Sequence, residues 1–522
     1  MRQEKREAMV KVFIDDTPYE FAEGLTIFNA AKEVGISIPH FCYHPAFLPE
    51  GTCRMCLVEI EGYPKLELSC STTLRDGMKI YTSTEKVVNA RQGVLEFLLA
   101  EHPLDCPICD QAGDCTLQDY YEDYGLNEPR FFETKEKRGK RVDIGKNLVH
   151  DQERCILCRR CVRFLRDITQ TQELGVFERG NHTEVNIYEG RPVNNHYSGN
   201  LAQLCPVGAI TDRDFRFKTR NWFLESGDSI CPFCSRGCAI TIDYHKGFAR
   251  FPVAKRVYRI NARKNSKVNS FWICDVGRYG YEYINLERQK TLSGPDKNRD
   301  YSWEEILSDY SKRLNRQRFS NRTANITIIC NSWMTNEELF LVRKIFQGDL
   351  PNSRIQLLDP PDEKGDNFLL TPERVPNRRG AVELGFETNP LDMETLKEET
   401  DLLIVFGTYL LEHSNRSELE AVLGSVEQSI LFTPYPHELN ELFDMVLPAA
   451  LIPESEGSLT NVDGLVQPFE KVLEPPGESR AVWRILRDLG KSLNIHFPYY
   501  KGLDSVETIR TELGKEISFF RK

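Results

Sequence analysis

The chain has 522 residues, which is enough for several domains that each bury a core of their own. A formal net charge of −11 argues against nucleic acid as a main partner. No apolar run is long enough to span a bilayer, and residues 1–9 lack the apolar core of a signal peptide. With no export signal, the 16 cysteines argue for metal ligation rather than disulfides.

The first predicted elements are two strands and a helix. Apolar and polar side chains alternate around Val10, Val12 and Ile14, and a second short strand is expected at residues 19–21. Thr26 can cap a helix, and Gly35 can end it. Because a β-grasp ferredoxin begins with strand, strand and helix, residues 9–85 are predicted to form a [2Fe–2S] ferredoxin-like domain.

Four cysteines follow these elements at once: Cys42, Cys53, Cys56 and Cys70. Plant-type ferredoxins space their ligands C-x4-C-x2-C…C, whereas the first gap here is ten residues, so the loop is longer. The four thiolates that a [2Fe–2S] cluster requires are still present. A structural zinc site is the alternative for four cysteines, and the β-grasp opening favours the cluster.

Residues 86–125 are predicted to form a mostly helical module with a second cluster site. One histidine and three cysteines follow an H-x3-C-x2-C-x5-C pattern: His102, Cys106, Cys109 and Cys115. A [4Fe–4S] cluster needs four protein ligands, and a neutral imidazole can be the fourth, as Rieske centres show for histidine on iron. The alternative is that His102 is an ordinary packing or surface histidine.

Residues 141–218 are predicted to form a bacterial-ferredoxin-like module with one [4Fe–4S] cluster. The ligand candidates read C-x2-C-x2-C with a later Cys-Pro: Cys155, Cys158, Cys161 and Cys205. In a two-cluster ferredoxin the fourth cysteine of each run ligates the other cluster. The second set would use positions that hold no cysteine here: Leu165, Asn195, Ser198 and Leu201. The module therefore keeps one of the two cluster sites of such a ferredoxin and lacks the other. A four-cysteine zinc site is the alternative for the remaining set.

Five arginines surround this run of cysteines: Arg154, Arg159, Arg160, Arg163 and Arg166. A cluster held by four thiolates is anionic, so nearby cations would raise its reduction potential. A solvated basic face explains most of the five at least as well.

A fourth set lies in residues 224–280, with the spacing C-x2-C-x3-C-x35-C: Cys231, Cys234, Cys238 and Cys274. The spacing alone fits zinc and iron–sulfur about equally. The three candidate cluster sites upstream favour a further [4Fe–4S] cluster.

From residue 286 the composition changes, and residues 293–298 look like a linker. Apolar runs then alternate with helix-like segments, which predicts a doubly wound α/β domain over residues 286–522. This half contains no P-loop, no G-x-G-x-x-G after a strand and no G-x-S-x-G.

Four ligand sets in this order, followed by an α/β region, resemble the large iron–sulfur subunit of bacterial NADH–quinone oxidoreductase, respiratory complex I. The resemblance is specific over residues 10–285. Its motifs are His102-x3-Cys106, the run from Arg154 to Cys161, Glu178-Arg179-Gly180, Tyr197-Ser198-Gly199-Asn200 and Cys205-Pro206-Val207-Gly208-Ala209. The resemblance implies an iron–sulfur electron-transfer chain with one [2Fe–2S] and three [4Fe–4S] clusters.

The fourth set resembles the cluster site at the front of molybdopterin oxidoreductases, and beyond residue 285 the likeness to that family is weaker. The landmarks are Thr335-Asn336-Glu337-Glu338, Leu447-Pro448, Glu454, Gly457, Asn461, Gly464 and Gln467. Three departures matter: no cysteine follows Cys330, Tyr409 replaces the Asn of the G-x-N turn that begins at Gly407, and the family's final domain does not follow Gln467. We therefore expect a scaffold without molybdopterin.

The resemblance also implies a path for electrons. Electrons from NADH would pass through flavin on a partner subunit, enter at the [2Fe–2S] site, cross the Cys155 cluster and reach the His102 cluster. Downstream ferredoxin-like and quinone-reducing subunits would accept them, and the Cys231 cluster would lie off the path. The chain itself would hold no NAD, no flavin and no catalytic residue, and would sit in the peripheral arm on the cytoplasmic side of the inner membrane.

Three other functions remain open on the sequence. The same series of electron-transfer clusters could serve a soluble hydrogenase- or formate-dehydrogenase-linked NAD reductase. A self-sufficient molybdopterin enzyme is a second alternative, against which the absence of a metal-ligating cysteine argues. A zinc-stabilised structural hub is the third.

Overall fold

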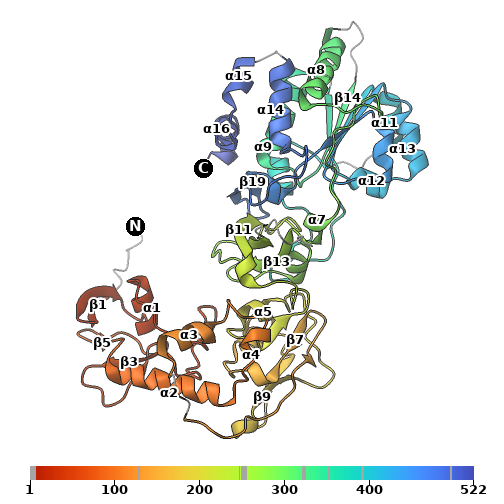
Figure 1. The fold of residues 1–522 in the computed structure, drawn as a ribbon. Helices are drawn as coiled ribbons and strands as arrows, with labels where there is room; N and C mark the ends of the chain where they lie inside the picture. The colour runs from red at the N-terminus through yellow and green to blue at the C-terminus, as the bar shows by residue number, and fades with distance from the viewer. Residues whose placement is uncertain are drawn as a thin grey trace. The chain divides into compact units, whose positions relative to one another are not determined.

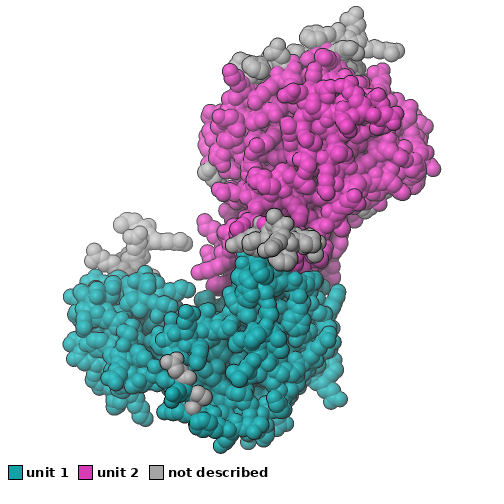
Figure 2. Space-filling view, in the orientation of Figure 1, with its two compact units in different colours: residues 1–224 teal, residues 225–522 magenta. Residues whose placement is uncertain are grey.

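The computed structural model describes residues 8–521 except 127, 129, 246, 248–254, 320–324, 351–352, 389–392 and 494–496, so most of the segment expected to lack an export signal lies outside the described residues. The chain divides into two compact units, Met1–Leu224 and Glu225–Lys522 (Figure 2). The division lies between the third and fourth ligand sets, well before the change of composition at residue 286.

Unit 1 begins with a five-stranded sheet and one helix. The strands are β1 (Met9–Ile14), β2 (Thr17–Ala22), β3 (Leu57–Ile60), β4 (Glu67–Leu68) and β5 (Lys79–Tyr81), in the order β2-β1-β5-β3-β4. The helix is α1 (Ile27–Glu33); the Thr26 hydroxyl caps it by accepting from the N–H of Asn29 at 3.3 Å. Gly35 follows with a φ of 80°, which glycine adopts without strain. The two strands and the helix expected here are confirmed.

The next segment of unit 1 consists of two helices joined by residues 102–115 (Figure 1). The elements are α2 (Glu85–Glu101), the 3₁₀ turn η1 (Cys106–Ile108) and α3 (Thr116–Tyr124). Arg91 of α2 is buried and donates to the carbonyl of Leu57 in β3, which fixes the helix to the first sheet.

The rest of unit 1 is built on a three-stranded antiparallel sheet. It contains β6 (Val142–Asp143), β7 (Leu148–His150) and β10 (Ile210–Asp212), in the order β10-β7-β6. A hairpin of β8 (Leu174–Phe177) and β9 (Glu184–Ile187) and two short helices, α4 (Arg160–Arg163) and α5 (Asn200–Leu204), complete it. Short turns are η2 (Gln152–Arg154), η3 (Phe164–Ile168), η4 (Gly180–His182) and η5 (Asn221–Phe223).

Unit 2 opens with a second three-stranded sheet. Its strands are β11 (Leu224–Ile230), β12 (Ala239–His245) and β13 (Val257–Ala262), and α6 (Asp275–Tyr279) and α7 (Glu282–Asn285) follow. The side chain of Asn269 closes the loop between β13 and α6, because it donates to three backbone carbonyls and accepts from the N–H of Ala239.

The remainder of unit 2 is a parallel five-stranded sheet with helices on both faces (Figure 1). The sheet order is β15-β14-β16-β17-β18, formed by β14 (Ile326–Cys330), β15 (Ser353–Leu357), β16 (Leu402–Phe406), β17 (Gln428–Thr433) and β18 (Met445–Pro448). A two-stranded ribbon adds β19 (Gly457–Thr460) and β20 (Val466–Phe469). The predicted alternation of apolar strands and helices is confirmed.

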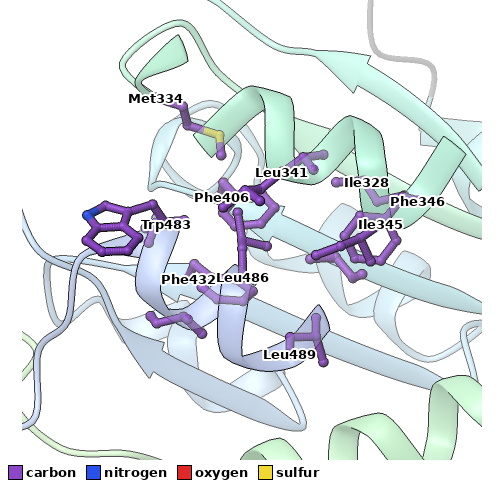
Figure 3. Packing of buried hydrophobic residues seen from close by; sticks show 14 of the residues in the cluster. Ile328, Met334, Leu341, Ile345, Phe346, Phe406, Phe432, Trp483, Leu486 and Leu489 are labelled. Carbon is purple, nitrogen blue, oxygen red and sulfur yellow. The ribbon is translucent and has the colours of Figure 1, made fainter. Parts of the chain in front are cut away.

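One face of the sheet is covered by α8 (Trp303–Phe319), α9 (Asn336–Arg343) and α14 (Val482–Leu493), and the other by α11 (Met393–Glu399) and α13 (Arg416–Leu423). Figure 3 shows the first core, in which Trp483 and Leu486 of α14 lie near Phe432. Phe406 and Phe432 stack with ring centroids 4.4 Å apart. The remaining helices are α10 (Arg378–Glu383), α12 (Tyr409–His413), α15 (Phe497–Gly502) and α16 (Val506–Glu516); the turns are η6 (Lys344–Asp349), η7 (Glu438–Leu442), η8 (Ile452–Glu454) and η9 (Ser518–Phe520).

The expected linker at residues 293–298 is wrong in one respect, since the segment is bound to the α/β domain. The backbone of Ser293 exchanges two hydrogen bonds with Val446, and the Lys297 ammonium donates to the carbonyls of Phe443 and Asp444. Among the described residues, no helix has the length and apolarity needed to cross a membrane.

Candidate metal centres

The Cys42 set forms two hydrogen-bonded pairs. The Cys53 thiol donates to the Cys42 sulfur and lowers the pKa of Cys42 to about 5. The Cys70 thiol likewise donates to Cys56 and lowers the pKa of Cys56 to about 7. The same bonds raise the pKa of each donor thiol. Two pairs of cysteines fit a [2Fe–2S] cluster, in which each of the two irons binds two of the four thiolates.

The loop that carries Cys53 and Cys56 has an unusual backbone. Arg54, between the two cysteines, has a φ of 58°, which is in the left-handed region. The N–H of Phe41 donates to the Cys53 sulfur at 3.4 Å. Hydrogen bonds to ligand sulfurs are one of the factors that set the potential of a cluster.

All four members of the His102 set line one pocket of about 650 Å³. Helix α2 ends at His102 and α3 begins directly after Cys115, so the turn between the helices brings the set together. Burial, and after it the charge of Arg154, lowers the pKa of His102 to about 4. The imidazole is therefore neutral at pH 7, which is the form that binds metal.

The Cys155 set encloses a much smaller cavity of about 20 Å³, lined by all four cysteines. Burial raises the pKa of Cys155 to about 12 and that of Cys158 to about 11. Leu157 and Arg159, which flank Cys158, have φ values of 54° and 58°. The sulfur of Cys205 accepts hydrogen bonds from backbone N–H groups of the residues that follow Pro206. The set is thus ringed by N–H donors suited to an anionic cluster.

Gly208 places the loop of Cys205 directly against the His102 set. A Cβ atom at Gly208 would lie 2.2 Å from the Cys109 sulfur, so no side chain fits there. The N–H of Thr116, at the start of α3, donates to the carbonyl of Pro206 at 3.1 Å. The loop that carries Cys205 therefore also contacts the His102 set.

Two arginines of α4 connect the Cys155 set to the loop of Cys42. The Arg163 guanidinium is 1% exposed and donates to the carbonyls of Cys42 and Leu48, the latter at 3.1 Å. It lies 5.1 Å from the centroid of the Phe47 ring. Arg160 donates to the carbonyl of Tyr43 at 2.7 Å.

Arg154 connects the Cys155 set to the His102 set. Its guanidinium is buried and bonds the Asp105 carboxylate at 2.9 Å and Asp151 at 3.2 Å. Because Arg154 and Arg163 are buried, the solvated basic face considered for the five arginines is wrong for these two. Arg166 is exposed and pairs with its neighbour Asp167, as that interpretation expects.

The Cys231 set lies in unit 2, between β11, β12 and α6. Its four cysteines are buried and close enough for their charges to interact. The Cys274 sulfur caps α6 by accepting from the N–H of Gly277 at 3.4 Å. Gly277 also lies close to Cys231, since a Cβ atom there would be 3.0 Å from the Cys231 sulfur.

Side chains far away in the sequence enclose this fourth set. The Gln467 amide donates to the carbonyl of Gly237 at 2.9 Å, and Asn461 approaches the carbonyl of Arg236 at 3.4 Å. The Ser235 hydroxyl bonds Thr371 at 3.0 Å. Asn461 and Gln467 were recognised in the sequence only as landmarks; Thr371, 136 residues from Ser235, carries no sequence signal for this role.

A cavity of about 320 Å³ lies at the carboxyl ends of β14, β16 and β17. Its position is the point where the strand order reverses, the usual ligand site of such sheets. Asn331, Gly407 and Tyr409 line it, and Gly407 has a φ of 86°. Cys330, the last residue of β14, is instead buried in the hydrophobic core.

Within the described ranges, no three His, Cys, Asp or Glu side chains converge as the ligands of a single metal ion would. In a four-iron cluster each ligand binds a different iron atom, so the ligands surround a cluster and not a point. Metal analysis distinguishes the two classes directly.

Comparison with known families gives five matches along the chain. The matching models are described as a 2Fe-2S iron-sulfur cluster binding domain (residues 7–85), the NADH-ubiquinone oxidoreductase-G iron-sulfur binding region (91–130), the ferredoxin-like domain of NADH-quinone oxidoreductase subunit 3 (145–211), the molybdopterin oxidoreductase Fe4S4 domain (225–286) and molybdopterin oxidoreductase (365–492). Iron–sulfur domains are thus followed by a domain similar to molybdopterin oxidoreductases.

Three curated proteins illustrate the similarity. The NADH-ubiquinone oxidoreductase 75 kDa subunit of Reclinomonas americana is 38% identical over 77% of this chain and 56% of its own length. The NADH-quinone oxidoreductase G subunit of Rickettsia felis is 37% identical over 65% of this chain and 49% of its own. The 78 kDa mitochondrial subunit of Candida albicans is 28% identical over 98% and 86%. The chain spans about half the length of the first two relatives.

Proposed function

We propose that this chain, which belongs to the family of NADH–quinone oxidoreductase G subunits and 75- to 78-kDa subunits, carries electrons between iron–sulfur clusters of an NADH dehydrogenase complex. The observation that carries the proposal is the arrangement of unit 1. Three ligand sets lie in one compact unit, and buried arginines and a shared glycine loop connect each set to the next.

Each ligand set holds one cluster in this proposal. A [2Fe–2S] cluster is held in a β-grasp domain by Cys42, Cys53, Cys56 and Cys70. Three [4Fe–4S] clusters are held by His102, Cys106, Cys109 and Cys115, by Cys155, Cys158, Cys161 and Cys205 in a bacterial-ferredoxin-like module, and by Cys231, Cys234, Cys238 and Cys274. The domain boundaries are those expected from the sequence, and the total is about fourteen irons per chain.

Electrons move from the Cys42 set through the Cys155 set to the His102 set. Arg160 and Arg163 support the first step, because they join α4 to the backbone around Cys42. Gly208 and Arg154 support the second, because they hold the Cys155 set against the His102 set. The protein's part is to fix the spacing, burial and hydrogen bonding of the clusters.

Unit 2 is a scaffold in this proposal, and its Cys231 cluster lies off the path. Two features support the absence of a pterin cofactor. Cys330 is buried in the core, and Tyr409 lines the cavity at the place where the family's turn has an asparagine. A pterin fluorescence signal after denaturation and oxidation, or bound molybdenum or tungsten, would contradict this part.

The partners follow from the family. A subunit that binds flavin and NADH supplies electrons, and ferredoxin-like and quinone-reducing subunits accept them. The chain associates with the membrane only through the complex, in the peripheral arm on the cytoplasmic side.

The first test is the metal content of anaerobically purified protein. We expect about fourteen irons with matching sulfide and no stoichiometric zinc, because each set holds a cluster. Stoichiometric zinc with little iron would contradict the whole proposal.

The second test is His102→Ala in the assembled complex. One of four ligands is lost, so low-temperature EPR should show one cluster signal lost or altered and three unchanged. Transfer from NADH to ferricyanide should persist, because ferricyanide takes electrons from the path before they reach the His102 cluster. Transfer to quinone should fail. His102→Cys is the matched control and should restore a cluster, at a lower potential because of the added thiolate. Unchanged EPR signals in His102→Ala would show that His102 is not a ligand.

A further inference from the structure

His150 is a buried histidine that belongs to none of the four predicted ligand sets. It is the last residue of β7, its exposed fraction is 0%, and neither ring nitrogen has a hydrogen-bond partner among the described residues. A buried polar group without a hydrogen-bond partner destabilises the folded state. Such a group in a native fold calls for an explanation, and an absent ligand is one of them.

The side chain of His150 lines the small cavity enclosed by the Cys155 set. Strand β7 pairs with β10 so that His150 lies opposite Ile210, and Ile210 lines the same cavity. The two strands therefore form one wall of the space that the four cysteines surround. Within the part of the chain that the structure describes, the other polar side chains that line this space are those of the cysteines, Arg159 and Arg160.

An imidazole carries at least one N–H donor in both its neutral and its protonated form, and a buried donor needs an acceptor. Among the side chains that line the cavity the arginines cannot accept, so the side-chain acceptors are the cysteine sulfurs. No backbone carbonyl of the described residues accepts from the ring.

We propose that the ring N–H of His150 donates a hydrogen bond to a sulfur of the cluster held by the Cys155 set, and that this bond raises the cluster's reduction potential. The inference rests on the proposed function, since it requires a cluster in this set. Reduction adds negative charge to the cluster, and a hydrogen bond to sulfur stabilises that charge. His150 is thus a positioning residue that tunes the cluster without ligating it.

The decisive experiment uses the complex with ¹⁵N-labelled histidine. Pulsed EPR is recorded on the reduced Cys155 cluster, in a His102→Cys background that removes the expected histidine ligand of the neighbouring cluster. We expect a weak ¹⁵N coupling to the cluster, and its loss in His150→Leu. Absence of the coupling where the cluster signal is present would overturn the inference. Absence of the cluster itself would instead overturn the proposed function.

Redox titration of the same signal gives the second measurement. His150→Leu should lower the potential of the Cys155 cluster and leave the other potentials unchanged. His150→Gln keeps an N–H donor and should recover part of the shift, which a purely structural role would not produce. His182→Leu is the matched control, because His182 is exposed in the same module, and it should shift nothing. Equal potentials in the parent and His150→Leu would also overturn the inference.

Discussion

The two units hold their cysteines through different kinds of contact. In unit 1, Arg163 joins the Cys155 set to the Cys42 loop, and Gly208 joins it to the His102 set. In unit 2, the contacts of the Cys231 set lead instead to Gln467 and Thr371 of the α/β domain. Contacts that connect one set to another suit electron transfer, whereas contacts that connect a set to a scaffold suit stability. The difference predicts that equivalent substitutions in the two units have unequal effects.

The largest expected effect comes from removing one cluster in each unit. Cys155→Ala and Cys231→Ala should each lower the iron content from about fourteen to about ten, because each removes one four-iron cluster. Transfer from NADH to quinone should fall at least about 100-fold in Cys155→Ala, because the barrier for electrons rises when a step of the path is missing.

In Cys231→Ala the same activity should stay within about twofold of the parent, because the proposed electron path does not include the Cys231 cluster. Iron analysis and NADH–quinone turnover on the same complex check both variants. Equal losses of turnover in the two variants would contradict the proposal that only the clusters of unit 1 lie on the electron path.

A smaller effect is expected from Gly208→Ala. The added Cβ would lie 2.2 Å from the Cys109 sulfur, so the loop or the cysteine must move. We expect partial loss of the His102 cluster signal in EPR and a roughly tenfold loss of quinone reduction. Gly93→Ala is the control, because a Cβ atom there meets nothing within 4 Å and helix α2 favours alanine over glycine. Full occupancy of the His102 cluster in Gly208→Ala would refute the close contact.

Arg163→Met tests the connection between the Cys42 and Cys155 sets. It removes charged hydrogen bonds to the carbonyls of Cys42 and Leu48, so unit 1 should lose about 3 kcal/mol. For a unit of this size the Tm should fall by roughly 6–12 °C, read from the loss of cluster absorbance on heating. Arg166→Met, at an exposed position, should change stability by less than about 0.5 kcal/mol. Similar Tm values for the two variants would show that the hydrogen bonds of Arg163 do not stabilise unit 1.

The pH dependence of unit 2 gives a further test. Burial, aided by the charge of Glu337, raises the pKa of Glu338 from its usual 4.5 to about 7. The folded state therefore holds this proton more tightly than the unfolded state does. The stability that the proton provides is complete below the unfolded pKa and is lost as the pH rises through 7.

The loss should amount to about 3 kcal/mol between pH 4.5 and pH 8 for this shift. Glu338→Gln should remove most of this pH dependence, because glutamine is neutral and still accepts from the N–H of Thr335. Burial also raises the pKa of the neighbouring Glu337, which accounts for the remainder. Calorimetry at pH 6 and pH 8 should show the difference in the transition of unit 2 and not in that of unit 1. A parallel pH dependence in the variant would rule out Glu338 as its source.

The sequence predicted the elements whose signals are local. Alternation around Val12 and the cap at Thr26 each predict an element that the structure contains, because they depend on neighbours within a few residues. The grouping of cysteines into four sets also followed from spacing, and the structure brings the members of each set together. That these sets hold clusters stays a prediction.

The sequence could not predict contacts between distant segments. Nothing in the residues around Arg163 shows that its guanidinium reaches the carbonyl of Cys42, 121 residues away. The position of His150 in the wall of a cavity depends on the pairing of β7 with β10, which lies about sixty residues further along the chain. The assignment of the Cys231 set to unit 2 rests on contacts with Thr371 and Gln467 for the same reason.

The enclosure of the Cys231 set by the α/β domain bears on how this chain can change in evolution. Trp333 donates to the carbonyl of Pro232 at 3.1 Å, so a third segment of the domain also touches the loop of this set. A deletion that removed any of these segments would uncover the loop of the Cys231 set. In the function proposed above the domain insulates the cluster of this set, so its loss would be selected against whether or not it binds a cofactor of its own.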